Sequence, residues 1–353
     1  MGMKRKLFLR KRPLLGIDIS HTYVKLMAIL PSGREVTCYG SLNSDPVKLR
    51  QALTGSSSYL SELIADMIHK NIVGTLNSDQ VVVSIPTNVT YSRSITLPKA
   101  GIKSLDDAIA LEASQYIPVA LSELNLSYEI LSESAESIDI LMSAAPKKVI
   151  DTVIEACAAS GLTVLAVQPS INAVARLITL TEQGHLPTVI VDIGAADTDL
   201  AILNERIRAN ASIQIGGNTL TYAIAEKLGV SLENAHQMKV LHGLSHGSKQ
   251  QKISDALKEP LSQIVSEVHK IIRYYNERLE ASEKIEQIII VGSGSDLPGL
   301  GDYFTNELVM PARIASPWLA LNFGSLPQPA KQFRPRYITV AGLATVQHED
   351  INI

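Results

Sequence analysis

Two stretches of the chain share one order of features: an apolar strand, an aspartate, a small polar turn and a second apolar strand. The first is Leu14–Leu30 with Asp18, and the second is Val189–Leu203 with Asp192. Small residues between two apolar runs are typical of a hairpin, because they let the backbone turn tightly. One hairpin would be ordinary. Two of them, opening the two halves of the chain, predict a duplicated domain whose matching loops face each other.

Strand and helix patterns alternate between the two hairpins, which favours an α/β fold. We interpret 83–167 as a compact strand–helix–strand–strand–helix–strand unit inserted into the first half. The expected elements are strand Val81–Ser84, helix Asp106–Tyr116, strands Leu126–Leu131 and Ile138–Ala144, helix Lys148–Ser160 and strand Leu162–Val167.

In the second half of the chain, the sequence pattern predicts three helices and one buried strand. The helices are expected at 218–228, 232–241 and 254–279, the strand at Ile288–Val291, and a flexible loop at 244–251. The resulting division assigns 1–82, 168–186 and 338–353 to the first core half, 83–167 to the insert, and 187–337 to the second core half.

Composition narrows the class of protein. The 353 residues are 46% hydrophobic and 19% charged, as expected for two globular domains or two fused halves. A net charge of −3 argues against nucleic acid as the main partner, because neutralising phosphates requires excess Lys and Arg. Cys38 and Cys157 have no second cysteine at metal-ligand spacing, so we expect two buried core residues in a reducing compartment.

Membrane and export signals are weak. No apolar run reaches the 18 residues or more that a spanning helix needs. The basic segment 1–13 leads straight into a strand without the apolar region of a signal peptide, so no export is indicated. This segment is a solvated arm or, alternatively, one that is weakly attracted to anionic lipid.

The two aspartate-bearing turns have the composition of phosphate-binding loops. Small residues let backbone N–H groups approach phosphate oxygens, and hydroxyl groups add donors. Aspartates repel phosphate, so Asp18 and Asp192 are expected to hold Mg²⁺, through water, or else merely to cap their turns. The candidate phosphate ligands are Ser20, His21, Thr22 and Lys25 in the first loop and Gly194, Ala195, Ala196, Asp197 and Thr198 in the second.

A third loop follows the buried strand Ile288–Val291. Gly292, Ser293 and Gly294 keep side chains out of the way, so a flat base or ribose can lie against the backbone there. Alone this signal is weak. The chain contains no Gly-x-x-x-x-Gly-Lys-[Ser/Thr] motif, which excludes a P-loop protein.

In this order the three loops resemble the phosphate-1, phosphate-2 and adenosine motifs of the actin, Hsp70 and sugar-kinase superfamily. Within it the chain is similar to the PilM family of actin-like type IV pilus assembly proteins. The likeness covers nearly the whole chain and includes a particular helix end, Glu-Ala-Ser-Gln-Tyr-Ile-Pro at 112–118. Other matching stretches are Gly216–Gly217, 291–300 and 340–344.

The resemblance implies an actin-like (ribonuclease H-like) fold of four subdomains, in which the insert is FtsA-like and replaces the usual small subdomain of actin. It implies ATP or ADP with Mg²⁺ in the central cleft, and slow or negligible hydrolysis. It also implies a groove, between the first core subdomain and the insert, for the N-terminal peptide of a PilN-like inner-membrane protein, with Tyr91 and 117–121 as candidate groove residues. Indirect contact with pilus motor ATPases, self-association and a cytoplasmic place beneath the membrane follow from the same likeness.

The chain departs from the superfamily at two positions of functional interest. Relatives carry Glu and Lys near the ribose or base, whereas here the corresponding string is Ala235-His236-Gln237-Met238-Lys239, so only Lys239 carries over. His236 donates to a ribose hydroxyl or has no role. Gln168 falls where Hsp70 and bacterial actins have a glutamate and actin itself a glutamine, and it is a candidate for positioning an attacking water.

Two other functions compete with an assembly protein. A sugar or carboxylate kinase of the same superfamily should carry a catalytic Asp facing a second substrate pocket, and the insert offers no obvious one. An FtsA-like membrane-associated filament protein should end in a basic amphipathic helix, whereas residues 347–353 are acidic.

Overall fold

The computed structural model describes residues 13–30, 34–55, 58–101, 104–182, 186–245, 250–279 and 283–351. Residues 1–12 of the basic segment and 246–249 of the expected flexible loop lie outside these ranges. In the part described, no helix is long and apolar enough to cross a membrane.

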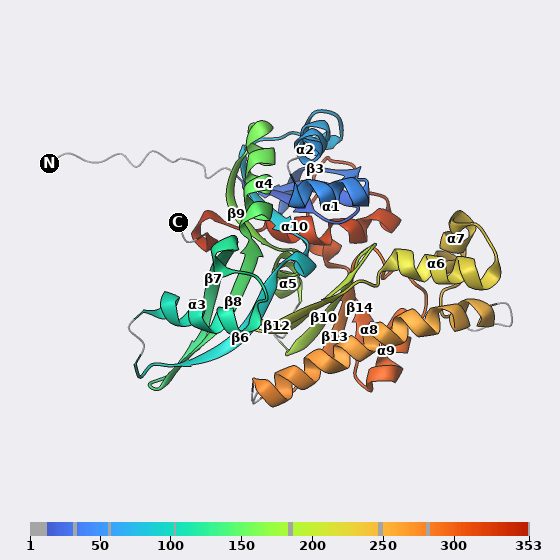
Figure 1. Cartoon of the computed structure of the whole chain (residues 1–353). Helices are drawn as coiled ribbons and strands as arrows, with labels where there is room; N and C mark the ends of the chain where they lie inside the picture. Colours follow the sequence, from blue (N-terminus) through green and yellow to red (C-terminus); the bar gives the residue numbers. More distant parts are fainter. Residues whose placement is uncertain are drawn as a thin grey trace.

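The molecule is built from two large sheets with helices outside and between them (Figure 1). The first sheet has the order β4-β3-β2-β1-β5-β9, and helices cover both faces. Its strands are β1 (Leu15–Ile19), β2 (Tyr23–Leu30), β3 (Glu35–Asn43), β4 (Ile72–Gly74), β5 (Gln80–Ile85) and β9 (Thr163–Pro169). Helices α1 (Pro46–Thr54), α2 (Tyr59–Lys70) and α4 (Lys147–Ala159) cover one face, and α5 (Ser170–Thr181) and α10 (Ile338–Ala344) the other.

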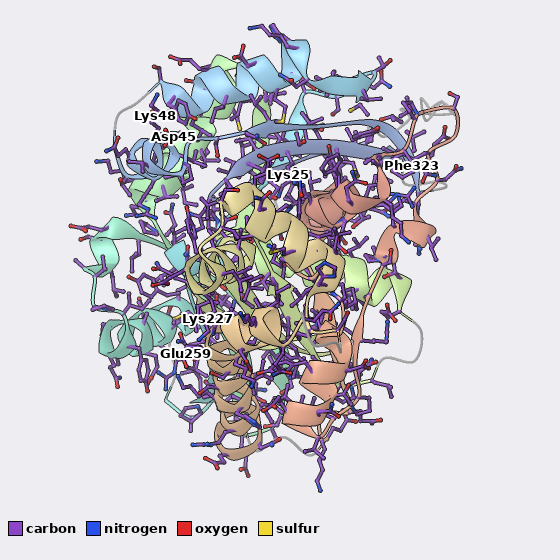
Figure 2. All side chains as sticks on the ribbon, turned by 90° about the vertical axis from the view of Figure 1, so that its right-hand side faces the viewer. Lys25, Asp45, Lys48, Lys227, Glu259 and Phe323 are labelled. Atoms are coloured by element: carbon purple, nitrogen blue, oxygen red, sulfur yellow. The ribbon has the colours of Figure 1, made fainter. Side chains whose placement is uncertain are left out.

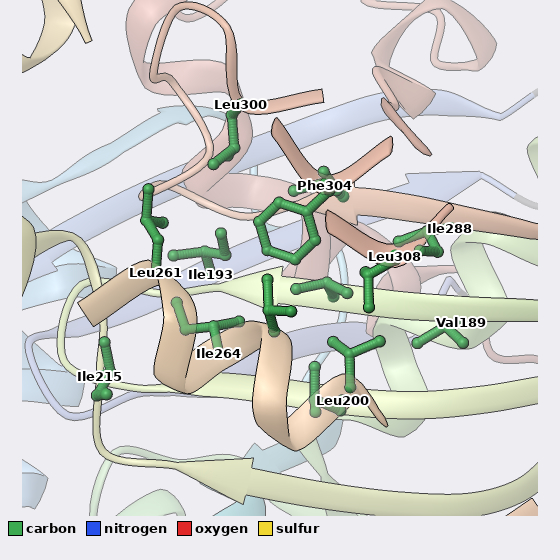
Figure 3. Packing of buried hydrophobic residues seen from close by; sticks show 14 of the residues in the cluster. Val189, Ile193, Leu200, Ile215, Leu261, Ile264, Ile288, Leu300, Phe304 and Leu308 are labelled. Carbon is green, nitrogen blue, oxygen red and sulfur yellow. The ribbon is translucent and has the colours of Figure 1, made fainter. Parts of the chain in front are cut away.

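The second sheet has the order β12-β11-β10-β13-β14, and its outer face packs on the long helix α8. Figure 3 shows the cluster between them, where Phe304, Leu261 and Leu200 meet with no exposed surface. The elements are β10 (Thr188–Ile193), β11 (Thr198–Asn204), β12 (Arg206–Ile213), β13 (Gln287–Val291), β14 (Ala312–Ile314), α6 (Gly217–Leu228), α7 (Leu232–His242), α8 (Gln251–Arg278) and α9 (Leu300–Leu308).

A third, three-stranded sheet of order β6-β8-β7 projects beside the core. Helix α3 covers it by burying Ile109 and Ala113 against Ile140 and Met142. Its elements are β6 (Tyr91–Pro98), α3 (Leu105–Tyr116), β7 (Leu124–Glu133) and β8 (Ser137–Pro146). The short 3₁₀ helices of the chain are η1 (Thr87–Val89), η2 (Leu121–Glu123), η3 (Pro317–Ala320), η4 (Lys331–Tyr337) and η5 (His348–Asp350).

The structure confirms the two predicted hairpins and their repetition. In β1–β2, Asp18 pairs with Lys25, and in β10–β11, Asp192 pairs with Asp199. A parallel strand flanks each hairpin, β5 beside β1 and β13 beside β10. The two halves therefore present equivalent turns at equivalent edges of their sheets. Cys38 and Cys157 are both buried free thiols, as expected.

The insert is smaller in the structure than the grouping expected for 83–167. Strand β9 pairs in parallel with β5 in the first core sheet, and α4 packs on α1 and α2. Strand β6, which the sequence pattern missed, supplies the third strand of the small sheet. A strand's sheet depends on its pairing partner, which is distant in sequence, so local pattern placed these elements wrongly. The exact domain boundaries remain a prediction.

Helices α5 and α10 form a middle layer that both large sheets share. One apolar cluster joins Met27 of β2, Val174 of α5, Val340 of α10 and Ile190 of β10. The two helices cross so closely that a Cβ on Gly342 would lie 1.9 Å from the carbonyl oxygen of Ala173. Glycine at this crossing is therefore a packing requirement of the middle layer.

We predict that Gly342→Ala lowers the free energy of unfolding by about 3 kcal/mol, because an added methyl group must push the two helices apart. Gly301→Ala on α9 is the matched control: its Cβ would meet the nearest atom at 3.4 Å, an ordinary contact. Urea unfolding followed by circular dichroism measures both changes. Equal stability of the two variants would contradict this account of the middle layer.

Candidate functional site

A polar cleft lies between the turn of the first hairpin and the turn of the second. The centre of a water molecule can occupy about 60 Å³ of it, so the cleft is narrow in this structure. Its walls come from both halves of the chain and from the segment before α10. The residues that line it are Asp18, Ser20–Tyr23, Lys25, Pro86, Ser170, Asp192, Gly194–Asp197, Asp199, Gly292, Ser293, Pro335, Arg336 and Thr339.

Asp18 is fixed by two hydrogen bonds at the end of β1. Its Oδ2 accepts from Lys25 Nζ at 2.5 Å, and its Oδ1 accepts from the Ser84 hydroxyl at 2.7 Å. Both Asp18 and Lys25 are buried, and Figure 2 shows Lys25 in the middle of the molecule, beside the strands of the first sheet. Ion pairing at this depth requires well-satisfied partners. The pair therefore gives the floor of the cleft a fixed geometry.

Asp192 occupies the equivalent point of the second hairpin. Burial, followed by repulsion from Asp199, raises the pKa of its carboxyl to about 8, although Lys25 opposes the shift. Gly292 makes room for this carboxylate, because a Cβ there would lie 2.2 Å from Asp192 Oδ1 and the residue has a φ of +92°. An aspartate with a raised pKa in a cleft is characteristic of functional sites, where a bound cation can stabilise its charge.

Asp199 is a cleft residue that the sequence analysis missed. Its carboxylate accepts from the Ser212 hydroxyl at 2.6 Å and from the Ser170 hydroxyl at 3.0 Å. Burial raises its pKa to about 6 even so. The sequence repeat could have identified it, because Asp199 follows Asp192 by the same number of positions as Lys25 follows Asp18. The duplicated site thus carries an ammonium on one side and a carboxylate on the other.

His21 links the two turns across the cleft. Its Nε2 lies 3.2 Å from Asp197 Oδ2 and 3.1 Å from Asn88 Oδ1. The hydrogen bond to Asp197 raises the pKa of His21 above its usual value, against the lowering effect of burial. Any group that binds between the turns has to replace this contact.

Several backbone N–H groups of the turns are free of acceptors. Those of His21, Thr22, Ala195, Ala196 and Asp197 have no hydrogen-bond acceptor among the described residues, whereas Gly194 N donates to Asp197 O. Successive free N–H groups in a turn form a concave site for an anion. Free N–H groups of this kind are what the predicted phosphate-binding loops require, and phosphate binding itself stays a prediction.

Several predicted site residues lie beside the cleft and not in its lining. Lys239 is buried and donates to the Gly217 carbonyl at 2.7 Å and to Thr221 Oγ1 at 2.9 Å, and burial lowers its pKa to about 8. The Thr198 hydroxyl donates to the Ile215 carbonyl. These contacts hold the second turn from behind.

The glycines behave similarly. Gly217 N donates to Gly194 O and Gly294 N donates to Ile193 O. A Cβ on Gly216 would lie 2.7 Å from Asp197 N, and one on Gly294 would lie 2.8 Å from Gly194 O. Close approach of backbones therefore joins the third loop and the start of α6 to the second turn.

Gln168 also lies outside the lining of the cleft. It pairs with Ser84 in the sheet, one strand beyond Asp18. Its Nε2 is buried without a hydrogen-bond partner in the described part of the chain. Gln168 therefore lies two strands away from Asp18 in the same sheet and does not belong to the lining of the cleft.

Arg336 is a second residue that the sequence analysis missed. It comes from the C-terminal segment, and its guanidinium lies 5.0 Å from the ring centroid of Tyr23 and 4.7 Å from that of Phe333. Cation–π contacts of this kind hold a guanidinium in place while its N–H groups stay available. Arg336 and Ser293, the latter from the third loop, both line the cleft.

The carboxylates that line the cleft suit a metal ion that keeps most of its bound waters. Within the described ranges, no three His, Cys, Asp or Glu side chains are arranged to hold a metal ion directly. Asp18 and Asp192 nevertheless line one cleft with Asp197 and Asp199. Mg²⁺ commonly binds through one or two carboxylates, waters and substrate phosphates, so this set fits it.

A second hollow lies next to the cleft, between the third sheet and β12. The centre of a water molecule can occupy about 370 Å³ there. Tyr91 and Ile117, two of the predicted groove residues, belong to its lining. The full lining is Thr87, Asn88, Thr90–Arg93, Tyr116, Ile117, Met142 and Asn210–Ser212.

The arrangement is that of the actin-like proteins: two related α/β halves with an aspartate-bearing hairpin turn from each at a common cleft. Two solved structures are similar to this chain in fold, at 14% identity and a TM-score of 0.54. They are the ethanolamine utilization protein EutJ from Carboxydothermus hydrogenoformans (96% of this chain, 93% of that one) and MreB 5 of Spiroplasma citri bound to AMPPNP (94% and 95%).

The sequence profile of the family described as type IV pilus assembly protein PilM matches residues 16–347. The chain belongs to this family. The structure titled PilM-PilN type IV pilus biogenesis complex is also similar, with a TM-score of 0.78 and 22% identity over 94% of this chain and 97% of that chain. The predicted actin-like α/β fold and the family are thereby confirmed.

We predict that stability falls as pH rises from 6 to 8 in the absence of metal. The Asp192 carboxyl has an ordinary pKa of 3.8 when exposed and about 8 when folded. Between these values the folded chain binds more protons than the unfolded chain, so the free energy of unfolding decreases with pH. Asp199 contributes in the same direction only up to about pH 6. Asp192→Asn should therefore raise the free energy of unfolding by about 2 kcal/mol at pH 8.

Urea unfolding at pH 6, 7 and 8 in EDTA measures this dependence. Asp151→Asn, an exposed change on α4, is the control and should keep the wild-type slope. If Asp192→Asn is less stable than wild type at pH 8, the fold stabilises the ionised Asp192 carboxylate, which would contradict this description.

Proposed function

We propose that the chain binds ATP or ADP with Mg²⁺ in the cleft and serves as a nucleotide-binding assembly protein of type IV pili. The observation that supports this most is the meeting of Asp18 and Asp192, at equivalent points of two hairpins, in one cleft with Lys25 and with turns whose backbone N–H groups lack acceptors among the described residues. In this proposal the N–H groups and Lys25 bind phosphate oxygens, and the two aspartates hold Mg²⁺ through water. Mg²⁺ neutralises phosphate charge beside the carboxylates.

The nucleoside would lie against the third loop. Gly292 and Ser293 line that end of the cleft together with Arg336. Because Lys239 already donates to Gly217 and Thr221, its proposed role becomes that of a support for the loop under the ribose. Entry of the triphosphate would part His21 from Asp197 and so change the spacing of the two halves.

Turnover is proposed to be slow or absent. A water aligned for in-line attack needs a polar group that reaches the cleft. Gln168, the residue predicted for this task, lies behind the lining. In the described part of the chain, no acidic residue of the third sheet lines the cleft. The alternative function, a sugar or carboxylate kinase, therefore gains no support from the cleft.

The proposed partner is the N-terminal peptide of a PilN-like inner-membrane protein. A PilM–PilN complex is among the solved structures that this chain resembles, and the hollow beside β6 offers a site for a peptide. Such a partner would keep the protein at the inner face of the membrane. Contact with motor ATPases, through that assembly, and self-association are part of the same proposal.

For the nucleotide, fluorescently labelled ATP titrated with Mg²⁺ should bind the wild type. Asp192→Asn should weaken binding at least tenfold, which corresponds to about 1.4 kcal/mol, because the metal loses a ligand. In EDTA the two proteins should differ little, and Asp151→Asn should bind like wild type throughout. Phosphate release should stay near background. Absence of binding by the wild type at millimolar nucleotide would defeat the proposal.

For the partner, a labelled PilN-type peptide should bind the wild type and lose at least fivefold in affinity with Tyr91→Ala, which removes a wall of the hollow. Tyr128→Ala, on exposed strand β7 of the same sheet, is the matched control and should change nothing. ATP affinity should be the same for all three proteins. Equal peptide binding by Tyr91→Ala and wild type would place the peptide elsewhere.

A further inference from the structure

Arg336 is a half-buried arginine without an acidic partner in the part of the chain that the structure describes. Four aspartates line the cleft with it, yet none of them forms an ion pair or hydrogen bond with its guanidinium. Arg334, two residues earlier on η4, donates to the Pro329 carbonyl at 3.1 Å and to Gln328 Oε1 at 2.9 Å. A guanidinium is always charged and has five N–H donors. Arg336 therefore has its charge and its donors to offer to a ligand.

Two aromatic rings fix the guanidinium of Arg336 at the cleft. One ring is that of Tyr23, on the first hairpin, at 5.0 Å from the centroid, and the other is that of Phe333, on η4, at 4.7 Å. Lys25 Nζ lies 5.9 Å from the centroid of the same Tyr23 ring, so two cations share this tyrosine. Contacts with the faces of rings restrict a guanidinium without using its N–H groups.

Arg336 also acts on the second half of the chain through its charge. Burial, followed by the charges of Lys239 and Arg336, lowers the pKa of His236 on α7, whereas Asp296 opposes the shift. Basic side chains from η4 and α7 therefore lie near one another, apart from the aspartates of the hairpin turns. Charges of one sign that converge on a cleft attract a ligand of the opposite sign.

The phosphate chain is the part of a nucleotide that suits these groups. Base and ribose are neutral, so neither would compensate the charge of Arg336. Phosphate oxygens accept two parallel N–H bonds from the planar fork of a guanidinium, which are charge-assisted and short. Arg336 lines the cleft with Ser293 of the third loop and with Tyr23 of the first hairpin. It thus lies between the proposed nucleoside end of the cleft and the first turn.

We propose that Arg336 binds the phosphate chain of the nucleotide, and that Tyr23 and Phe333 position its guanidinium for this contact. The inference rests on the proposed nucleotide binding, and it assigns to the C-terminal segment a ligand that neither hairpin supplies.

The test uses the full chain with Mg²⁺ and compares ATP with inorganic tripolyphosphate, which lacks the nucleoside, by isothermal titration calorimetry. Arg336→Gln removes the charge and the fork, so it should weaken the binding of both probes roughly tenfold. Arg334→Gln is the matched control, because it makes the same change on the same 3₁₀ helix outside the lining of the cleft. It should bind both probes like wild type.

The role of Phe333 is tested by a double-mutant cycle. Phe333 lies outside the lining of the cleft, so it acts only through Arg336. Phe333→Leu should weaken tripolyphosphate binding about threefold in the wild-type background. It should cause no further loss in the Arg336→Gln background, whereas a merely structural effect would be the same in both.

A second measurement needs no variant and decides the question if circular dichroism shows that Arg336→Gln is unfolded. Phenylglyoxal, which modifies arginine side chains, is applied to the wild type, and the modified residues are identified by mass spectrometry. ATP and tripolyphosphate should each protect Arg336, and adenosine should not. Arg50, an exposed residue of α1, is the internal reference and should react equally in every sample.

The remaining outcomes separate this inference from the proposed function. Undiminished tripolyphosphate binding by folded Arg336→Gln, absence of tripolyphosphate binding by a wild type that binds ATP, or protection of Arg336 by adenosine overturns the phosphate contact and leaves nucleotide binding standing. Equal losses from Phe333→Leu in both backgrounds overturn the positioning role of Phe333. A wild type that binds neither ATP nor tripolyphosphate overturns the inference and the proposed function together.

Discussion

The balance of charge in the cleft is the constraint on which the rest of the structure depends. Asp18, Asp192, Asp197 and Asp199 line a narrow space with two cationic groups, the buried ammonium of Lys25 and the guanidinium of Arg336. Burying carboxylates near each other is unfavourable unless protons, cations or hydrogen bonds compensate. Serine hydroxyls compensate in part for Asp18 and Asp199, and the raised pKa of Asp192 shows where compensation is incomplete. In the proposed complex, the Mg²⁺ ion would place positive charge beside these carboxylates.

The fold creates this constraint by duplication. Each half places a hairpin turn at the edge of its sheet, and the shared layer of α5 and α10 fixes the two sheets so that the turns meet. Ser170, at the start of α5, donates to Asp199, so the middle layer contacts the cleft directly. Packing in the middle layer and polar geometry in the cleft are therefore parts of one arrangement.

The cleft and the hollow share a wall. Asn88 lines the hollow and contacts His21 of the cleft, and Ser212 lines the hollow and donates to Asp199. Thr87 shares a hydrogen bond of 2.9 Å with Ser170 in the same wall. The cleft and the hollow are thus joined by direct side-chain contacts, so displacement of His21 by a ligand in the cleft would remove its contact with Asn88 of the hollow.

Local sequence patterns predicted what depends on local chemistry. The Asp–turn–strand repeat predicted both hairpins, and periodic apolar residues predicted α3, α4, α6 and α8. Strand β6 was missed because its alternating Ser and Thr lack a continuous apolar run, and β9 was misplaced because its partner is far away in sequence. Arg336 could not be predicted, since only the fold brings the C-terminal segment to the first hairpin.

The most direct measurement is a crystal structure of the chain with AMPPNP and Mn²⁺ in place of Mg²⁺. The account predicts an anomalous manganese peak between Asp18 and Asp192, phosphates next to the His21 and Ala195 turns, and separation of His21 from Asp197. Crystals grown at saturating AMPPNP that show no manganese peak and an unbroken His21–Asp197 contact would contradict it.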